Sequence, residues 1–155
     1  MAEAPTENQP LADEIRRLMG ASRRASLGTV AERDQLAFPF VSLVIPALAA
    51  DATPILLMSD LADHSKHLRQ RPQASLLFDG TLELAEPLTG PRVTLLGQVA
   101  ITTAADDRAS YLAQHPEAAL YADFRDFHFY RFIAQEALFV AGFGRIHRLA
   151  GADLQ

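Results

Sequence analysis

Residues 58–68 carry most of the side chains in this sequence that could bind a ligand. Four residues that could donate to a phosphate lie here between two apolar runs: Ser59, His64, Ser65 and Lys66. The spacing predicts a strand that ends where a short helix begins. The first N–H groups of a helix lack backbone partners, and the helix dipole favours an anion there. Hydroxyl, imidazole and ammonium groups at such a point are donors to a phosphate, so the segment predicts a phosphate site.

Acidic and imidazole residues in the same segment limit this prediction. Asp60 and Asp63 would repel a phosphate at close range, and we interpret them as N-cap residues whose oxygens accept helix N–H bonds. His64 and His67 are three residues apart and share one helix face. Two ligands are too few for a zinc site, so we predict no metal site. We interpret His64 as a phosphate donor and His67 as a surface residue.

Composition excludes several classes of function. The 155 residues suffice for one domain with a core. A formal net charge of -5 argues against nucleic-acid binding, which requires a basic face. The absence of Cys excludes disulfides and thiolate chemistry. No apolar stretch approaches the ~20 residues of a membrane span, and the polar start is unlike a signal peptide. We therefore expect a cytoplasmic protein with no nucleic-acid or membrane partner.

Apolar periodicity and turn residues predict the elements that position these side chains. Helical spacing predicts helices over residues 10–24, 63–71 and 103–115. Strands are predicted over residues 25–31, 38–48, 55–59, 74–79, 92–101, 127–133 and 137–148. Pro39 and Pro46 restrict the second strand to a sheet edge or bend it. We expect a turn near residues 135–136 between the last two strands.

These elements predict a mainly β fold. Antiparallel strands joined by short turns, with few helices, favour a small β-barrel of six to seven strands with flanking helices. Neither an internal repeat nor a second domain is visible. We expect residues 1–9 to form a disordered arm and residues 10–150 to form a single domain.

A resemblance to a known family rests on seven short segments that follow one another in order. They are residues 26–30, 40–44, 57–65, 87–97, 115–121, 126–131 and 142–145. Together they resemble the FMN-binding split-barrel family typified by pyridoxamine 5′-phosphate oxidase, and most of all its heme-utilisation (HugZ-like) branch. The resemblance implies a split β-barrel homodimer with FMN at the dimer interface, and heme as the alternative cofactor.

The resemblance also implies which residues contact the FMN. They lie on the second strand, at the end of the third strand, at the start of the next helix and at the start of the fifth strand: Ser42, Leu43, Val44, Ser59, His64, Ser65, Lys66 and Arg92. The oxidase has an Arg-Lys pair where Asp63 and His64 stand here, and an Arg near the place of Ser42. An arginine clamp holds phosphate through charge-assisted hydrogen bonds, so the clamp is weaker in this chain.

The functional expectation is a flavin-dependent oxidoreductase whose substrate is unknown. The flavin would carry the chemistry, and the sequence indicates no catalytic residue. Two alternatives stay open. One is a heme-binding or heme-degrading protein on the same barrel, to which His128 and His147 could contribute. The other is a non-catalytic dimeric module that has lost FMN.

Overall fold

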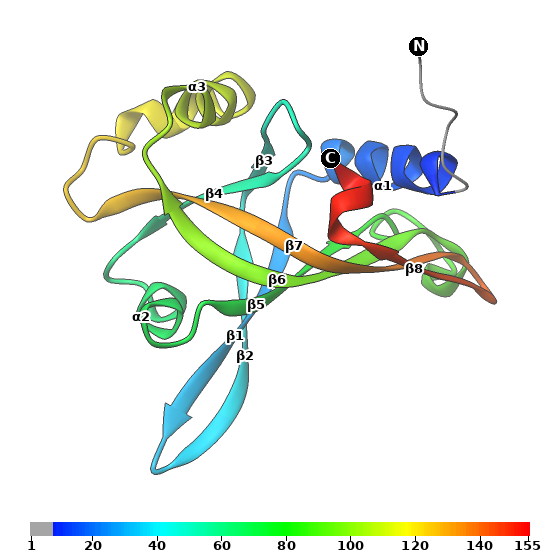
Figure 1. The fold of residues 1–155 in the computed structure, drawn as a ribbon, viewed down its shortest axis with the longest axis horizontal. Coiled ribbons are helices and arrows are strands. Elements are labelled where there is room, and N and C mark those ends of the chain that lie inside the picture. The colour runs from blue at the N-terminus through cyan, green and yellow to red at the C-terminus, as the bar shows by residue number, and fades with distance from the viewer. Residues whose placement is uncertain (1–7) are drawn as a thin grey trace.

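A computed structural model describes residues 8–155 of the chain as eight antiparallel strands in one sheet with helices packed against it (Figure 1). The helices and strands are α1 (Gln9–Ala21), β1 (Ala25–Arg33), β2 (Leu36–Val44), β3 (Pro46–Leu48), β4 (Pro54–Ser59), α2 (Asp63–Gln70), β5 (Gln73–Asp79), β6 (Arg92–Thr102), α3 (Ala105–Gln114), β7 (Phe127–Gly142) and β8 (Arg145–Ala150). Short 3-10 turns are η1 (Pro87–Thr89), η2 (Pro116–Leu120) and η3 (Gly151–Leu154). The predicted mainly β fold is confirmed, with eight strands in place of six to seven.

The N-terminal arm that was predicted over residues 1–9 falls mostly outside the described residues. Helix α1 already begins at Gln9. Within residues 8–155, no helix is both long enough and apolar enough to cross a membrane.

The two edge strands of the sheet are joined directly, because they follow one another in the sequence. Its strand order is β2-β1-β5-β6-β7-β4-β3, with β8 paired to β7 outside this path. The two edge strands, β2 and β3, are consecutive in sequence and separated only by Ile45. The chain therefore passes directly from one edge of the sheet to the other. Pro39 and Pro46 lie on these edges, as predicted, where a missing N–H breaks no ladder hydrogen bond.

The last two strands differ from the prediction. A single strand of 16 residues, β7, runs straight through the turn expected near residues 135–136, and the last strand, β8, begins only at Arg145. The ladder to β6 shifts register between Leu96 and Gly97, so the extra residue is absorbed in a β-bulge. A side chain at Gly97 would meet the Ile133 carbonyl oxygen at 2.1 Å, so only glycine fits there. The turn comes later, at Gly144, whose φ of 76° suits glycine.

Two clusters of buried side chains stabilise the fold. The larger one fills the barrel and includes Ile15 and Met19, with which α1 covers one end of the barrel. The smaller one lies between the sheet and α3 and includes Tyr111 and Phe129. Each fully buried large apolar side chain contributes about 1.5–3 kcal/mol to the free energy of unfolding.

The β1–β2 hairpin projects from the barrel (Figure 1). Its turn residues Asp34 and Gln35 both have positive φ, which a two-residue type I′ turn requires. Strand β2 and the next residue expose three apolar side chains at alternating positions: Val41 (70%), Leu43 (68%) and Ile45 (43%). We call these three the β2 apolar surface. An apolar surface on an edge strand is typical of an interaction site.

Candidate cofactor site

The strand–helix corner predicted as a phosphate site is present, but the Ser59 hydroxyl already forms hydrogen bonds with other residues of the chain. Strand β4 ends at Ser59 and α2 begins at Asp63. The Ser59 hydroxyl donates to the Asp126 carboxylate and accepts the Leu61 N–H at 3.1 Å. Ser59 therefore stabilises the turn and has no free donor for a phosphate.

The N-terminus of α2 has no capping side chain. Its N-cap residue is Ala62, and no side chain accepts a hydrogen bond from the first turn. The interpretation of Asp60 and Asp63 as N-caps is therefore wrong. Asp63 lies 3.8 Å from Lys66 instead, and Asp60 binds Arg69 and His128. The first N–H groups of α2 keep their capacity to bind an anion.

The predicted residues of α2 point in different directions, because successive helical residues are rotated by about 100°. The Ser65 side chain is buried and lies on the same side of α2 as Tyr130. Lys66 is exposed and pairs with Asp63. His67 is buried toward β1 and β2, so its interpretation as a surface residue is wrong. The structure therefore does not bring Ser65 and Lys66 together into one phosphate site.

His67 links α2 to the β1–β2 hairpin. Its Nδ1 lies 3.0 Å from the Thr29 hydroxyl, and its ring packs edge-on against Phe40 with centroids 5.0 Å apart. The other ring nitrogen, Nε2, is buried and has no hydrogen-bond partner in the described part of the chain. His67 packs the helix onto the sheet, which sequence spacing alone did not reveal.

His64 is half-buried at the start of α2. Burial and the nearby His67 hold the pKa of His64 below its ordinary value, while Asp63 acts in the opposite direction. The imidazole is therefore neutral at pH 7 and is a weaker phosphate donor than an imidazolium.

The three predicted contacts on β2 alternate between its faces. Val44 is buried in the barrel core, and Ser42 is half-buried on the same face. Leu43 points to the opposite face as part of the β2 apolar surface. Only Leu43 of the three offers an exposed side chain.

Arg92 lies at the far end of β6 from α2. Its guanidinium donates to the carbonyls of Leu88 and Gly90 at 3.0 and 3.2 Å. The same strand meets α2 at Ile101, so about 30 Å of strand, at about 3.3 Å per residue, separates Arg92 from that point. Arg92 and the α2 corner therefore lie at opposite ends of β6.

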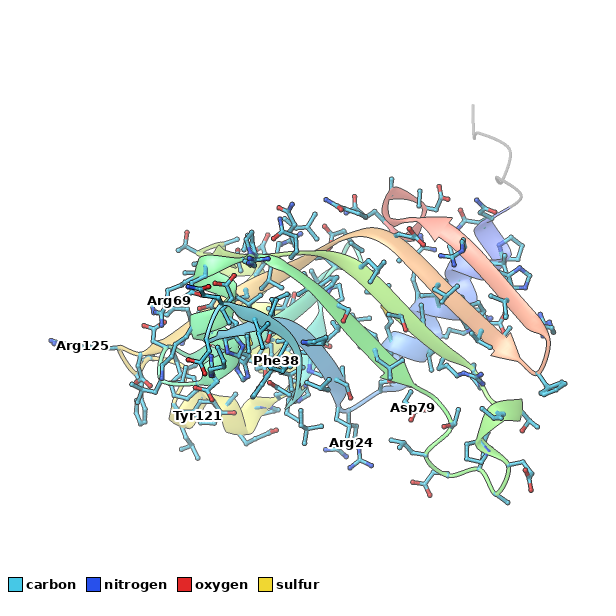
Figure 2. The ribbon with its side chains drawn as sticks, turned by 90° about the horizontal axis from the view of Figure 1, so that it is seen from below. Arg24, Phe38, Arg69, Asp79, Tyr121 and Arg125 are labelled. Atoms are coloured by element: carbon cyan, nitrogen blue, oxygen red, sulfur yellow. The ribbon has the colours of Figure 1, made fainter. Side chains whose placement is uncertain are left out.

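A groove of about 640 Å³ lies between the end of α1, the β2 apolar surface and the loop after β5. We call it the α1–β2 groove. Its apolar walls are Leu18, Leu43, Ile45 and Leu82. Arg23 and Arg24 stand at its rim and form no ion pair with any described residue. Figure 2 shows Arg24 pointing outward on the side of the molecule where Asp79 lies.

The groove also contains groups of other charge. Asp79, Glu83 and Glu117 add carboxylates, and His115 adds an imidazole whose Nε2 lies 2.7 Å from the Pro46 carbonyl. These residues come from segments far apart in the sequence, so no local motif could identify them as a group. The groove fits a ligand with an apolar body whose acidic groups lie at the two arginines.

Comparisons with known proteins give a consistent family assignment. The family model described as "CREG, beta-barrel" matches residues 6–153. The non-canonical heme oxygenase HOZ, chloroplastic, of Arabidopsis thaliana is 36% identical over 133 residues, which are 84% of this chain and 40% of that protein. The chain thus spans less than half the length of this relative.

Solved structures share the fold. The heme binding protein from Mycobacterium smegmatis has a TM-score of 0.84 at 26% identity, covering 99% of this chain and 61% of the other. A protein of the pyridoxinephosphate oxidase family from Clostridium acetobutylicum, related to general stress protein 26, has a TM-score of 0.68 at 15% identity, covering 95% and 99%. These similarities confirm the split β-barrel that the sequence resemblance implied.

Proposed function

The chain belongs to the CREG β-barrel family, and from this premise we propose that it binds heme in a groove completed by a second copy of the chain. Two similar proteins support heme over FMN as the cofactor. One is named a heme oxygenase and the other a heme binding protein. The oxidase-type phosphate clamp also lacks its basic residues here, since Asp63 and His64 stand in their place.

The observation that carries this proposal is the α1–β2 groove. Heme is a flat apolar macrocycle with two carboxylates, and it needs apolar walls together with nearby cations. The groove offers apolar walls and two arginines that have no ion pair with the described residues. Its volume of about 640 Å³ lies within the usual range of small-molecule sites. We expect the carboxylates to lie at Arg23 and Arg24, because Asp79, Glu83 and Glu117 would repel them elsewhere.

Two observations support a second copy as the missing wall. Leu43 and Ile45 line the groove and belong to the β2 apolar surface, so one side of the groove is open. Arg92 and the α2 corner lie at opposite ends of β6, about 30 Å apart along the strand, so a site that uses both would draw one of them from another copy. We therefore expect a homodimer with the cofactor at its interface.

A hemin titration tests the proposal. Purified protein titrated with hemin should show a saturable Soret absorbance. The double variant Arg23→Gln with Arg24→Gln should weaken hemin binding by about tenfold or more, since a hydrogen bond to a charged group is worth about 1.5–3 kcal/mol. Arg17→Gln is the matched control, an exposed arginine on α1 that lies outside the groove. Non-saturable binding, or an equal loss in the control, would contradict the proposal.

FMN binding is the second candidate, and the uncapped N-terminus of α2 favours it. An FMN phosphate would accept hydrogen bonds from the first N–H groups of α2 beside His64. The test is quenching of FMN fluorescence. His64→Ala should weaken FMN binding and leave hemin binding unchanged, with Gln70→Ala in the last turn of α2 as control. The flavin-dependent oxidoreductase activity expected from the sequence would require FMN, and a chain that binds neither cofactor would be a non-catalytic dimeric module.

A further inference from the structure

We propose that a second groove, between α2 and the ends of β6 and β7, binds a small ligand with an apolar body and a carboxylate head. This groove has a volume of about 400 Å³ and shares no lining residue with the α1–β2 groove. It lies on the face of α2 opposite His67. We call it the α2–β7 groove. The proposal is independent of heme binding because the two grooves use different residues.

The floor of the groove is apolar. Leu68 of α2 and Val99 of β6 are buried side chains that form its base. Ile101 continues the same face of β6 and is 57% exposed. An exposed isoleucine beside buried apolar side chains offers a surface that an apolar ligand body would cover.

The single carboxylate of the groove is already bonded. Asp60 Oδ1 accepts from Arg69 at 3.3 Å, and the Asp60 carbonyl accepts from the same guanidinium at 3.1 Å. Asp60 Oδ2 lies 3.0 Å from His128 Nε2. A guanidinium has five N–H donors, so Arg69 keeps donors that these two hydrogen bonds do not use.

Two buried hydroxyls add donors to the groove. Ser65 is 1% exposed, and its Oγ forms no hydrogen bond of good geometry with a described residue. The Tyr130 hydroxyl is the polar group beside it. Burial raises the pKa of Tyr130, the contact with Ser65 acts in the opposite direction, and the phenol stays protonated. Buried hydroxyls normally have a hydrogen-bond partner. An oxygen atom of a ligand would supply the partner that Ser65 lacks.

The balance of these groups defines the ligand. Donors from Arg69, Ser65 and Tyr130 remain available, whereas the only carboxylate, Asp60, is engaged by two basic side chains. A divalent cation would need free carboxylate ligands, and the single carboxylate that lines the groove, Asp60, is engaged. A carboxylate matches the planar guanidinium of Arg69, and an apolar body matches Val99 and Ile101. The volume admits a small molecule.

Phenylacetate and its neutral analogue phenylacetamide are the probes that test this proposal. Backbone amide signals of ¹⁵N-labelled protein should shift with phenylacetate at Ser65, Arg69 and Ile101, and shift much less with phenylacetamide. Arg69→Gln should weaken phenylacetate binding by about tenfold. Arg71→Gln is the matched control, because Arg71 pairs with Glu32 outside the groove. Hemin binding should be equal in the two variants, which separates this groove from the heme site.

Three outcomes would overturn the proposal. The amide signals do not shift with phenylacetate, they shift equally with phenylacetamide, or Arg69→Gln binds phenylacetate as tightly as the wild type does. Thermal unfolding of the variant shows whether it folds. If Arg69→Gln is unfolded, Ile101→Asp takes its place, since the exposed side chain of Ile101 tolerates a polar residue. This variant places a carboxylate in the groove and should abolish phenylacetate binding by repulsion. Retained binding would then contradict the proposal.

Discussion

At the scale of single residues, one buried acid joins α3 to the sheet. Asp107 is 1% exposed and accepts from Arg131 Nε and Nη2, each at 2.7 Å. The Thr102 hydroxyl donates to the same carboxylate at 2.6 Å, and Arg131 also donates to Asp51 at 2.9 Å. The hydrogen bond from Arg131 lowers the pKa of Asp107, while burial acts in the opposite direction.

Asp107→Asn should lower the free energy of unfolding by about 1.5–3 kcal/mol at pH 7, because it replaces the buried charged partner of Arg131 with a neutral amide and leaves only the exposed Asp51 as a carboxylate partner. A carboxyl whose pKa is lowered in the folded state stabilises the protein above its unfolded pKa of about 4. That stability is lost as the pH falls through the lower, folded value. Wild-type stability should therefore fall below about pH 4 more steeply than that of the variant, as urea unfolding at several pH values would show.

A surface pair provides the control for this prediction. Asp13 forms an exposed ion pair with Arg16, and such pairs contribute about 0–1 kcal/mol. Asp13→Asn should therefore have a small effect. Equal destabilisation by both substitutions would show that burial of Asp107 is not the cause.

The sequence was enough to predict which polar residues lie at the α2 corner, but not which way their side chains point. A helix over residues 63–71 already separates Ser65 from His67, because residues two apart in a helix point about 200° apart. Which of the two faces β1 depends on how α2 packs, and that is decided by the Phe40 and Thr29 contacts from a distant hairpin. Local spacing carries no information about such contacts.

At the scale of elements, the turn between β3 and β4 holds a strained residue. Ala52 has a φ of 63°, in the left-handed region that disfavours residues with a Cβ atom. The turn is fixed around it, because the Ala49 N–H donates to the Thr53 carbonyl at 2.9 Å and the Thr53 N–H donates to Asp51 at 3.0 Å. The backbone cannot relax without losing these hydrogen bonds.

Ala52→Gly should raise the free energy of unfolding by about 0.5–1 kcal/mol, since glycine adopts this conformation without steric cost. Chemical denaturation measures the effect. Ala50→Gly in the same turn is the control, because Ala50 has no positive φ. It should be neutral or destabilising, because glycine gives the unfolded chain more freedom. If Ala52→Gly lowered the free energy of unfolding, the conclusion that Ala52 is strained would be wrong.

Most elements follow from the sequence, and the errors have local causes. The strand β5 and the helix α2 lie within one residue of their predicted bounds. The turn expected at residues 135–136 was wrong because the sheet absorbs the irregularity as a bulge opposite Gly97. Whether an irregular residue makes a turn or a bulge depends on the strand beside it, which periodicity does not reveal.

At the scale of the whole molecule, the β2 apolar surface predicts association of two copies. Val41 is 70% exposed on an edge strand and does not line the α1–β2 groove. Val41→Asp would place a charge at the expected interface in both copies. Burying one valine is worth about 1.5–3 kcal/mol, so the dissociation constant of the dimer should rise by about a hundredfold or more. Sedimentation equilibrium measures the change.

Ile146→Asp is the control for this prediction. Ile146 is 64% exposed on β8, which pairs with β7 and is not adjacent to β2 in the sheet. It should leave the mass in solution unchanged. A wild-type protein that sediments as a monomer at all concentrations, with or without hemin, would contradict the homodimer.

The long strand β7 determines the order in which the protein can form during translation. It pairs with β6, β4 and β8, and β4 otherwise has only the three-residue β3 as a neighbour. The ribosome synthesises β4 well before β7, so Ile55 and Leu56 await their partners in a nascent chain. The barrel cannot close until Gly142 has left the exit tunnel, and a chain interrupted before that point keeps open strand edges that favour aggregation.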